Sequence, residues 1–348
     1  MSLVAELIQK TKTDFIQTKY SAKDFQSDQD VRWCPGCGDY SILAQVQRIM
    51  PDFGVARHNI VWVSGIGCSS RFPYYMDTYG FHGIHGRAPA IASGIKLARP
   101  DLSVWMVTGD GDGLSIGGNH FIHLLRRNID IKVLLFNNQI YGLTKGQYSP
   151  TSEYGKVTKS TPHGSIDHPF NPTLLALGAE GSFVARTLDR DPKHMQVILK
   201  RAGEFHGTAF VEIYQNCNVF NDGAFFTFTE KETKDDTVLF LEHGKPMIFG
   251  KEKNKGIKLD GFTPRVVPLG DGVSTNDLLV HNEKDSTLAF ILANFSAMEG
   301  MPRPVGIFKA VERSTYDADM EAQIQKAEAK KKGDLNALLR SGQTWKIG

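Results

Sequence analysis

The sequence predicts an α/β protein that is built on a doubly wound, mostly parallel sheet. From residue 31 to about residue 220, short apolar runs rich in β-branched residues alternate with longer runs of helical periodicity. Glycine-rich or polar turns follow the strand-like runs, which is typical of consecutive β-α-β units. A chain of 348 residues has room for one large domain or two ordinary ones.

The predicted elements of this region, in chain order, are a helix over 40–50, a strand over 59–64, a helix over 90–99 that ends before Pro100, a strand over 103–108, a further helix, a strand over 131–136, a helix over 173–177, a strand over 183–186, a helix over 192–205 and a strand over 208–213. Asp39 precedes the first helix and is a candidate for its N-terminal cap. Residues 139–172 are rich in Gly, Pro, Ser, Thr and His. Irregular segments of such length are often functional lids or interfaces.

We expect three segments: an N-terminal arm over 1–30 with one short helix, the α/β domain over 31–220, and an irregular C-terminal extension over 221–348. The extension contains apolar runs at 238–243, 247–250 and 303–308, and a charged helix is predicted over 317–332. The lysines that end this helix indicate a solvated face rather than a binding patch.

Composition excludes several classes of function. Hydrophobic residues make up 41% and charged residues 22%, as in ordinary globular proteins, and the net charge of +2 gives no reason to expect a nucleic-acid or membrane partner. The first residues lack the basic start and apolar core of a secretory signal, and no apolar run approaches ~18 residues. We therefore expect a cytoplasmic protein.

The stretch 109–138 carries the clearest chemical signal. Asp110 follows one predicted strand and Asn138 follows the next, so a right-handed crossover places both at the carboxyl edge of the sheet. Their oxygens, beside glycines that let a diphosphate approach the backbone, suit a Mg²⁺–diphosphate site.

Two common glycine-rich motifs do not match this stretch. The dinucleotide-binding motif is not completed, because Leu114 occupies the position of its third glycine, and a P-loop sequence is absent. Gly-Asp-Gly followed after 28 positions by Asn137-Asn138 resembles the thiamine-diphosphate fingerprint; the simpler alternative is an acid that caps a helix.

The four cysteines, Cys34, Cys37, Cys68 and Cys217, are separated by 3, 31 and 149 positions. Without a secretory signal a disulfide framework is not expected. Structural zinc sites usually bring two close pairs, whereas one pair with two separate cysteines fits a [4Fe–4S] cluster gathered from several loops. A single buried apolar cysteine is the alternative for Cys68 or Cys217. Thiamine diphosphate accepts the electrons that decarboxylation of a 2-oxo acid releases. An iron–sulfur cluster is needed only where the resulting intermediate is oxidised one electron at a time.

In combination, the motifs resemble the β subunits of 2-oxoacid:ferredoxin oxidoreductases, most closely the 2-oxoglutarate type. The matching stretches are 33–40, 65–71, 85–88, 109–113, 137–151 and 169–172. This resemblance covers roughly residues 31–225, and it implies the thiamine-diphosphate-binding, or PP-type, α/β domain. It also implies oxidative decarboxylation of 2-oxoglutarate with coenzyme A to succinyl-CoA and CO₂, with ferredoxin as electron acceptor, or the reverse.

The resemblance further implies the site residues. Cys34, Cys37, Cys68 and Cys217 would hold the [4Fe–4S] cluster, while Asp110, Asn138 and the carbonyl of Ile140 would bind Mg²⁺. The residues that would line thiamine diphosphate are Ile66, Gly67, Cys68, Ser69, His85, Gly86, Gly111, Asp112, Gly142 and Leu143. Arg71 is a candidate for the substrate carboxylate and Lys145 for substrate or coenzyme A, each with a solvated cation as the alternative.

The family also implies a partner. The glutamate that activates the cofactor lies on a separate pyrimidine-binding domain, for which this chain has no room, so we expect an α subunit that supplies it together with the coenzyme A region. An (αβ)₂ heterotetramer is the expected assembly, with residues 139–172 and the C-terminal third as candidate contacts. The alternatives are a subunit acting on pyruvate or several 2-oxoacids, a cluster-carrying electron-transfer module without thiamine, and a zinc-stapled binding module.

Overall fold

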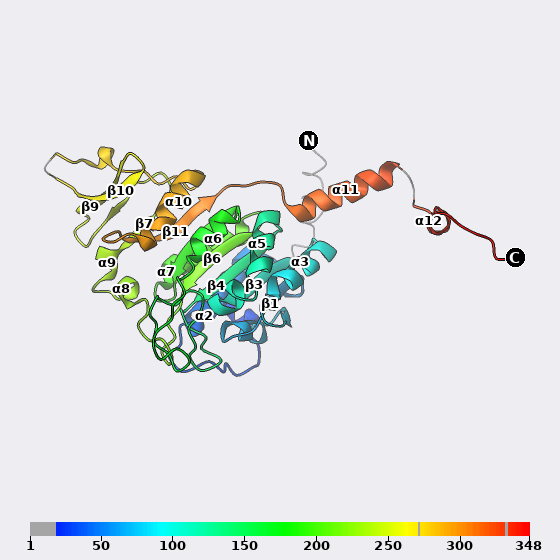
Figure 1. Ribbon diagram of the computed structural model, residues 1–348, viewed down its shortest axis with the longest axis horizontal. Coiled ribbons are helices and arrows are strands. Elements are labelled where there is room, and N and C mark those ends of the chain that lie inside the picture. Colours follow the sequence, from blue (N-terminus) through cyan, green and yellow to red (C-terminus); the bar gives the residue numbers. More distant parts are fainter. Residues whose placement is uncertain (1–18, 271, 331–332) are drawn as a thin grey trace.

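The structure is a computed structural model that describes residues 19–270, 272–330 and 333–348. Its centre is an eight-stranded sheet with the order β2-β1-β3-β4-β6-β5-β11-β7 (Figure 1). Six of these strands, β1 to β6, run parallel to one another. Strand β11 pairs antiparallel with β5 and parallel with β7, so β11 and β7 run in the opposite direction. The strands are β1 Ile60–Ser64, β2 Tyr79–His82, β3 Ser103–Gly109, β4 Ile131–Asn137, β5 Phe183–Leu188, β6 Ala209–Tyr214, β7 Val238–Leu241 and β11 Arg303–Ala310.

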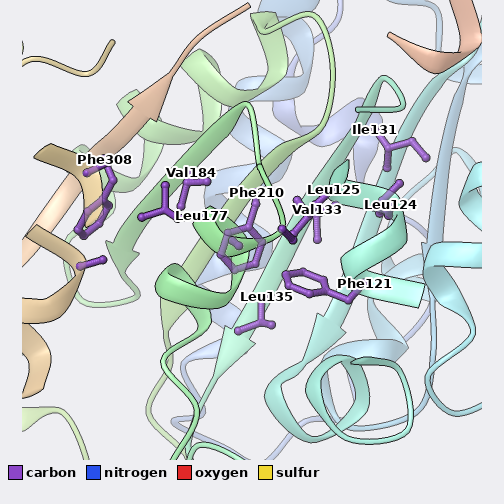
Figure 2. Packing of buried hydrophobic residues seen from close by; sticks show 14 of the residues in the cluster. Phe121, Leu124, Leu125, Ile131, Val133, Leu135, Leu177, Val184, Phe210 and Phe308 are labelled. Carbon is purple, nitrogen blue, oxygen red and sulfur yellow. The ribbon is translucent and has the colours of Figure 1, made fainter. Parts of the chain in front are cut away.

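Helices cover both faces of this sheet. On one face lie α3 Ala88–Ala98, α5 Gly118–Arg127, α6 Pro172–Gly178 and α10 Ser286–Asn294, and on the other α2 Asp39–Ile49 and α7 Pro192–Glu204. Figure 2 shows the first layer, where Phe121 and Leu124 of α5 pack over Val133, Leu135 and Phe210 of the central strands. Burying each such side chain contributes roughly 1.5–3 kcal/mol. The strands read as continuous apolar runs because both of their faces are covered. The doubly wound, mostly parallel sheet predicted from the sequence is confirmed.

Most predicted elements of the α/β domain lie within two residues of the observed ones. The glycine-rich turn differs, because the chain becomes helical directly at Asp110 in the short α4 Asp110–Leu114 and then bends into α5. The predicted cap at Asp39 is wrong. Gly38 occupies the N-cap position of α2, and Asp39 is its first residue, with a buried carboxylate that caps nothing.

The region beyond residue 220 contributes two strands, β7 and β11, to the main sheet. The predicted boundary near residue 220 therefore separates segments that share one sheet. A second, three-stranded sheet is formed by β8 Ile248–Phe249, β9 Lys255–Asp260 and β10 Thr263–Pro268, and the short helices α8 Phe226–Thr229 and α9 Lys234–Thr237 precede it. The extension is irregular because these short helices and antiparallel strands replace the β-α-β units of the main domain.

The two ends of the described chain differ. Residues 19–30 lie against the body, where Phe25 of the 3-10 turn Ala22–Phe25 is fully buried; the predicted N-terminal helix falls mainly outside the described residues. At the other end, α11 Tyr316–Lys330 and α12 Leu335–Leu339 project away from the sheet (Figure 1). Within the described residues, no helix combines the length and apolar character needed to cross a membrane.

Candidate functional site

A cleft of about 1030 Å³ lies at the carboxyl edge of the central strands, as expected for an open α/β sheet. The loops that follow β1, β3 and β4 form its walls, together with the segment 138–171, in which the structure has no helix or strand. The predicted cofactor and metal residues that line this cleft are Ile66, Gly67, Cys68, Ser69, His85, Asp110, Gly111, Asp112, Asn138, Ile140, Gly142 and Leu143. Gly86 is not among its lining residues.

Asp110 is the buried acid of the cleft, with only 2% of its surface exposed. Burial raises the pKa of its carboxyl to about 6, although hydrogen bonds from Ser149 and Thr151 oppose the shift. Both hydroxyls donate to the same oxygen, Oδ2, at 2.5 Å, so Mg²⁺ can use Oδ1. The sequence motif 137–151 contains both hydroxyl residues, but nothing in their spacing indicated that the loop folds back onto Asp110.

Asn138 lies opposite, just past the end of β4. Its amide nitrogen donates to Gln215 Oε1 at 2.9 Å, and its side-chain oxygen accepts from the Ile140 backbone at 3.2 Å. The intervening Gln139 has φ +56°, a left-handed conformation that few residues other than glycine adopt. This sharp turn brings Asn138 and Ile140 to the same cleft, where oxygen donors from an acid, an amide and the backbone suit Mg²⁺.

Asp112 joins three loops of the site. Its Oδ1 accepts hydrogen bonds from the backbone N–H groups of Ile66 at 3.0 Å and Gly86 at 2.7 Å, and it lies 2.7 Å from His85 Nδ1. Thr108 donates to the other oxygen at 2.7 Å. Gly86 thus lies behind the cleft and acts on it through Asp112, whereas His85 lies on the cleft wall.

The glycine at position 111 leaves room for an aromatic wall. A Cβ there would lie 2.2 Å from the ring of Tyr141, whose hydroxyl donates to the Gly111 carbonyl at 2.9 Å. Ser69 has a buried hydroxyl without a hydrogen-bond partner in the described part of the chain, and it lines the same cleft. A buried unpaired hydroxyl calls for a ligand donor or acceptor, which a diphosphate supplies. The residues present therefore fit a Mg²⁺–diphosphate group.

The four cysteines surround a second pocket of about 180 Å³, directly beside the cleft. Cys68 and Cys217 face a common point, since a Cβ on Gly142 would lie 3.5 and 3.6 Å from their sulfurs. Gln215 donates to the Cys37 sulfur at 3.2 Å. Among the described residues, no three His, Cys, Asp or Glu side chains are grouped tightly enough to hold a single metal ion. A ring of thiols spread around a pocket fits a larger, multi-iron group instead.

Two thiols of this pocket, those of Cys37 and Cys68, have raised pKa values. Burial, with a contribution from the nearby Asp39 carboxylate, raises the pKa of the Cys68 thiol to about 12 and that of the Cys37 thiol beyond its usual range. Burial and the neighbouring Asp189 raise the pKa of Asp39 itself to about 7. A cationic metal group would stabilise the thiolates and the Asp39 carboxylate, so its binding would release protons from the cysteines. Asp39, which sequence reasoning placed only as a helix cap, lines both pockets.

The two predicted cations lie outside the main cleft. Arg71 lines the cysteine pocket and a third pocket of about 610 Å³, and it donates to the Arg32 carbonyl at 3.4 Å. Lys145 is exposed and lines the cysteine pocket, on a turn where its φ is +76°. The third pocket shares Ile66, Gly67 and Leu143 with the cleft, so Arg71 borders the space in which a substrate would meet the cofactor.

Comparison with known proteins gives a consistent picture. A family model described as the C-terminal TPP-binding domain of thiamine pyrophosphate enzymes matches residues 60–213. The chain is 53% identical to 2-oxoglutarate oxidoreductase subunit KorB of Mycobacterium tuberculosis, over 93% of this chain and 88% of that protein. It is 43% identical to 2-oxoacid:ferredoxin oxidoreductase 2, subunit beta, of Aeropyrum pernix, over 57% of this chain and 64% of that protein.

A solved structure is similar over nearly the whole chain. It is described as 2-oxoglutarate:ferredoxin oxidoreductase from Magnetococcus marinus with 2-oxoglutarate, coenzyme A and succinyl-CoA bound. The match has a TM-score of 0.75 and 33% identity, and it covers 93% of this chain and 97% of the other. The resemblance predicted from the sequence is confirmed: this chain belongs to the β-subunit family of 2-oxoacid:ferredoxin oxidoreductases, with the thiamine-pyrophosphate-binding fold.

Proposed function

We propose that this chain is the thiamine-diphosphate-binding β subunit of a 2-oxoglutarate:ferredoxin oxidoreductase. The enzyme converts 2-oxoglutarate, coenzyme A and oxidised ferredoxin to succinyl-CoA, CO₂ and reduced ferredoxin, or catalyses the reverse reaction. The mycobacterial relative is named for 2-oxoglutarate, and the similar solved structure holds 2-oxoglutarate, coenzyme A and succinyl-CoA. These names support 2-oxoglutarate as the substrate.

One observation carries the proposal: the cofactor cleft and the cysteine pocket share residues. Asp39, Cys68, Asn138 and Gln215 line both spaces. A site for decarboxylation therefore lies directly beside a site for one-electron transfer. A cluster-carrying module without thiamine would not need the cleft, and a zinc-stapled binding module would need neither the cleft nor thiols spread around a pocket.

The residues have separate tasks in this proposal. Asp110, Asn138 and the Ile140 carbonyl hold Mg²⁺, and the loops 65–69 and 141–143 enclose the cofactor. When bound there, thiamine diphosphate would supply the nucleophile and electron sink that decarboxylation of a 2-oxo acid needs. Cys34, Cys37, Cys68 and Cys217 would hold the [4Fe–4S] cluster, which would supply a one-electron route toward ferredoxin. His85 lies on the cleft wall, where its contact with Asp112 fixes one ring nitrogen and leaves the other for the substrate.

Arg71 and Lys145 supply positive charge near the substrate. Arg71 borders the cleft from the third pocket, and its guanidinium suits a carboxylate such as the distal group of 2-oxoglutarate. Lys145 is exposed beside the cysteine pocket, where it can meet coenzyme A or the substrate. A relative named for 2-oxoacids in general keeps pyruvate or a broad substrate range as the second candidate.

The active enzyme requires an α subunit, which the name of a relative described as subunit beta implies. That subunit supplies the glutamate that activates the cofactor and the coenzyme A region, in an (αβ)₂ heterotetramer. Residues 139–172 and the region after residue 220 are the proposed contacts. The purified single chain should therefore be inactive, and turnover by it at the rate of the complex would contradict this assignment.

A substrate panel on the co-purified αβ complex tests the function, with ferredoxin or a viologen as electron acceptor. We expect kcat/KM for 2-oxoglutarate to exceed that for pyruvate by about tenfold or more, because a hydrogen bond to a charged group contributes about 1.5–3 kcal/mol. Equal values would favour the broad-range alternative. Asp110→Ala should abolish Mg²⁺-dependent thiamine diphosphate binding but leave the brown colour of the cluster, because the cysteines lie in the adjoining pocket.

A further inference from the structure

A buried chain of polar side chains runs from Asp110 into the middle of the sheet. Thr151 Oγ1 lies 2.5 Å from Asp110 Oδ2 and 3.0 Å from Asn137 Oδ1. The Asn137 amide donates to Glu212 Oε1 at 2.8 Å, and Arg186 Nε donates to Glu212 Oε2 at 2.7 Å. None of the five side chains is more than 3% exposed.

The far end of this chain is held firmly. Arg186 of β5 donates to Thr173 Oγ1 at 2.9 Å and to the Pro304 carbonyl at 3.1 Å. Its guanidinium also lies 5.1 and 5.2 Å from the ring centres of Tyr214 and Phe308. The ion pair between Arg186 of β5 and Glu212 of β6 is therefore also hydrogen-bonded to β4 and β11, beneath the cofactor cleft.

A buried ion pair is weak evidence for stability, because desolvation offsets most of the attraction between its charges. What Glu212 does achieve is orientation. Its Oε1 accepts from the Asn137 nitrogen, so the Asn137 oxygen must point toward Thr151. The Asp110 and Asn137 oxygens share the single hydroxyl proton of Thr151 as a three-centre hydrogen bond, in which the shorter contact is to the charged Asp110 carboxylate. Together with the hydroxyl of Ser149, this proton holds Asp110 Oδ2 in place.

Partners of this kind, one step removed from a metal ligand, fix the ligand's orientation and change metal affinity by about 10- to 100-fold when removed. We propose that Glu212 and Thr151 are positioning residues for the Mg²⁺ site: Glu212 orients Asn137, and Asn137 with Thr151 holds the Asp110 carboxylate in its metal-binding position. This inference rests on the proposed function, since it needs Mg²⁺ and thiamine diphosphate at Asp110.

The test uses the αβ complex stripped of Mg²⁺ and titrated calorimetrically with MgCl₂ at saturating thiamine diphosphate. Thr151→Val removes the hydroxyl with little change of shape and should raise the Kd for Mg²⁺ by about 10- to 100-fold. Thr151→Ser restores the hydroxyl and should recover affinity to within about threefold of wild type. At saturating Mg²⁺, turnover of Thr151→Val should return toward the wild-type value.

Two further variants separate positioning from general damage. Thr187→Val is the matched control, because Thr187 is equally buried in β5 but bonds His194 on the other side of the strand. Its Kd for Mg²⁺ should stay at the wild-type value. Glu212→Gln should weaken Mg²⁺ binding like Thr151→Val, and the double variant should lose no more than the larger single loss, because both act through one chain of contacts.

Wild-type affinity in Thr151→Val, or losses that multiply in the double variant, would overturn the inference. If Glu212→Gln does not fold, the comparison of Thr151→Val, Thr151→Ser and Thr187→Val still decides. Failure of the proposed function has a different signature: the wild-type complex would then bind Mg²⁺ no better than its Asp110→Ala variant.

Discussion

The backbone of Gly65 lies directly against the carboxylate of Asp112. A Cβ on residue 65 would come within 2.1 Å of Asp112 Oδ2 and 2.6 Å of Oδ1. The carboxylate cannot withdraw freely, because its oxygens are bonded to the backbone of Ile66 and Gly86 and to the Thr108 hydroxyl. The loop after β1 and the loop after β3 are thus fitted to each other behind the cofactor cleft.

Gly65→Ala should therefore lower the free energy of unfolding by about 1–3 kcal/mol, as overpacking does in other buried sites. Chemical denaturation of the chain measures this loss. Gly94→Ala is the control, since a Cβ there meets nothing within 4 Å and the position is helical. That substitution should be neutral or slightly stabilising. Equal behaviour of the two variants would show that the loops can separate at no cost.

Asp112→Ala should be more damaging than Asp112→Asn. The alanine leaves the buried donors of Ile66 and Gly86 without an acceptor, at a cost of about 1–3 kcal/mol for each unpaired group. Asparagine keeps one acceptor oxygen for them and can turn its amide nitrogen toward the Thr108 hydroxyl. Denaturation midpoints of both variants give the comparison, and the reverse order would refute this account of Asp112.

Cys217→Ser should remove the brown colour of the protein and lower its iron content, because Cys217 is the buried thiol of the cysteine pocket. Visible absorbance and iron analysis of anaerobically prepared complex measure the change. Asp110→Ala, prepared in parallel, should keep both. Full colour and iron in the serine variant would exclude Cys217 as a cluster ligand.

His194 makes stability depend on pH. Burial lowers the pKa of its imidazole from 6.5 to about 4, so the folded chain favours the neutral ring, which contacts the Thr187 hydroxyl at 2.8 Å. This contribution is complete above pH 6.5 and is lost as the pH falls through that range toward pH 4, by at most about 3 kcal/mol. Unfolding free energies of wild type and His194→Gln at pH 7 and pH 5 should converge at the lower pH. A constant difference would contradict the assignment.

Removal of residues 331–348 should leave the thermal stability of the sheet unchanged. Leu335, Leu338 and Leu339 are about 70% exposed, so truncation deletes little buried surface. If this end contacts the α subunit, the truncated chain should co-purify with less of that subunit. Unchanged co-purification would limit the subunit contact to other surfaces.

Sequence patterns were informative where structure is local. The β-α-β alternation and the ends of β3 and β4 follow from apolar runs and glycine-rich turns, so the sequence alone predicts that Asp110 and Asn138 lie at one sheet edge. The cap prediction for Asp39 is wrong because cap residues and first-turn residues share the same chemistry, and only the tight turn at 34–38 determines which role applies.

Long-range pairings were beyond such patterns. Strand β11 joins β5 in antiparallel orientation although more than 100 residues separate them, and a run of apolar residues does not specify its neighbour. Likewise, the irregular composition of the segment 138–171 gave no sign that Ser149 and Thr151 return to Asp110. These contacts depend on the whole folded sheet edge rather than on any local periodicity.

The cysteines differ in exposure, so the proposed redox centre would have an inner side that faces the cofactor cleft and an outer side that faces solvent. Cys68 borders the cofactor cleft and Cys217 is buried, whereas Cys34 is exposed at the outer side of the pocket. A cluster held there would receive electrons on its inner side and meet solvent on its outer side. Molecular oxygen would approach by that same outer side, so the part of the surface that would serve electron exit in the proposed enzyme is also where oxidative damage would begin.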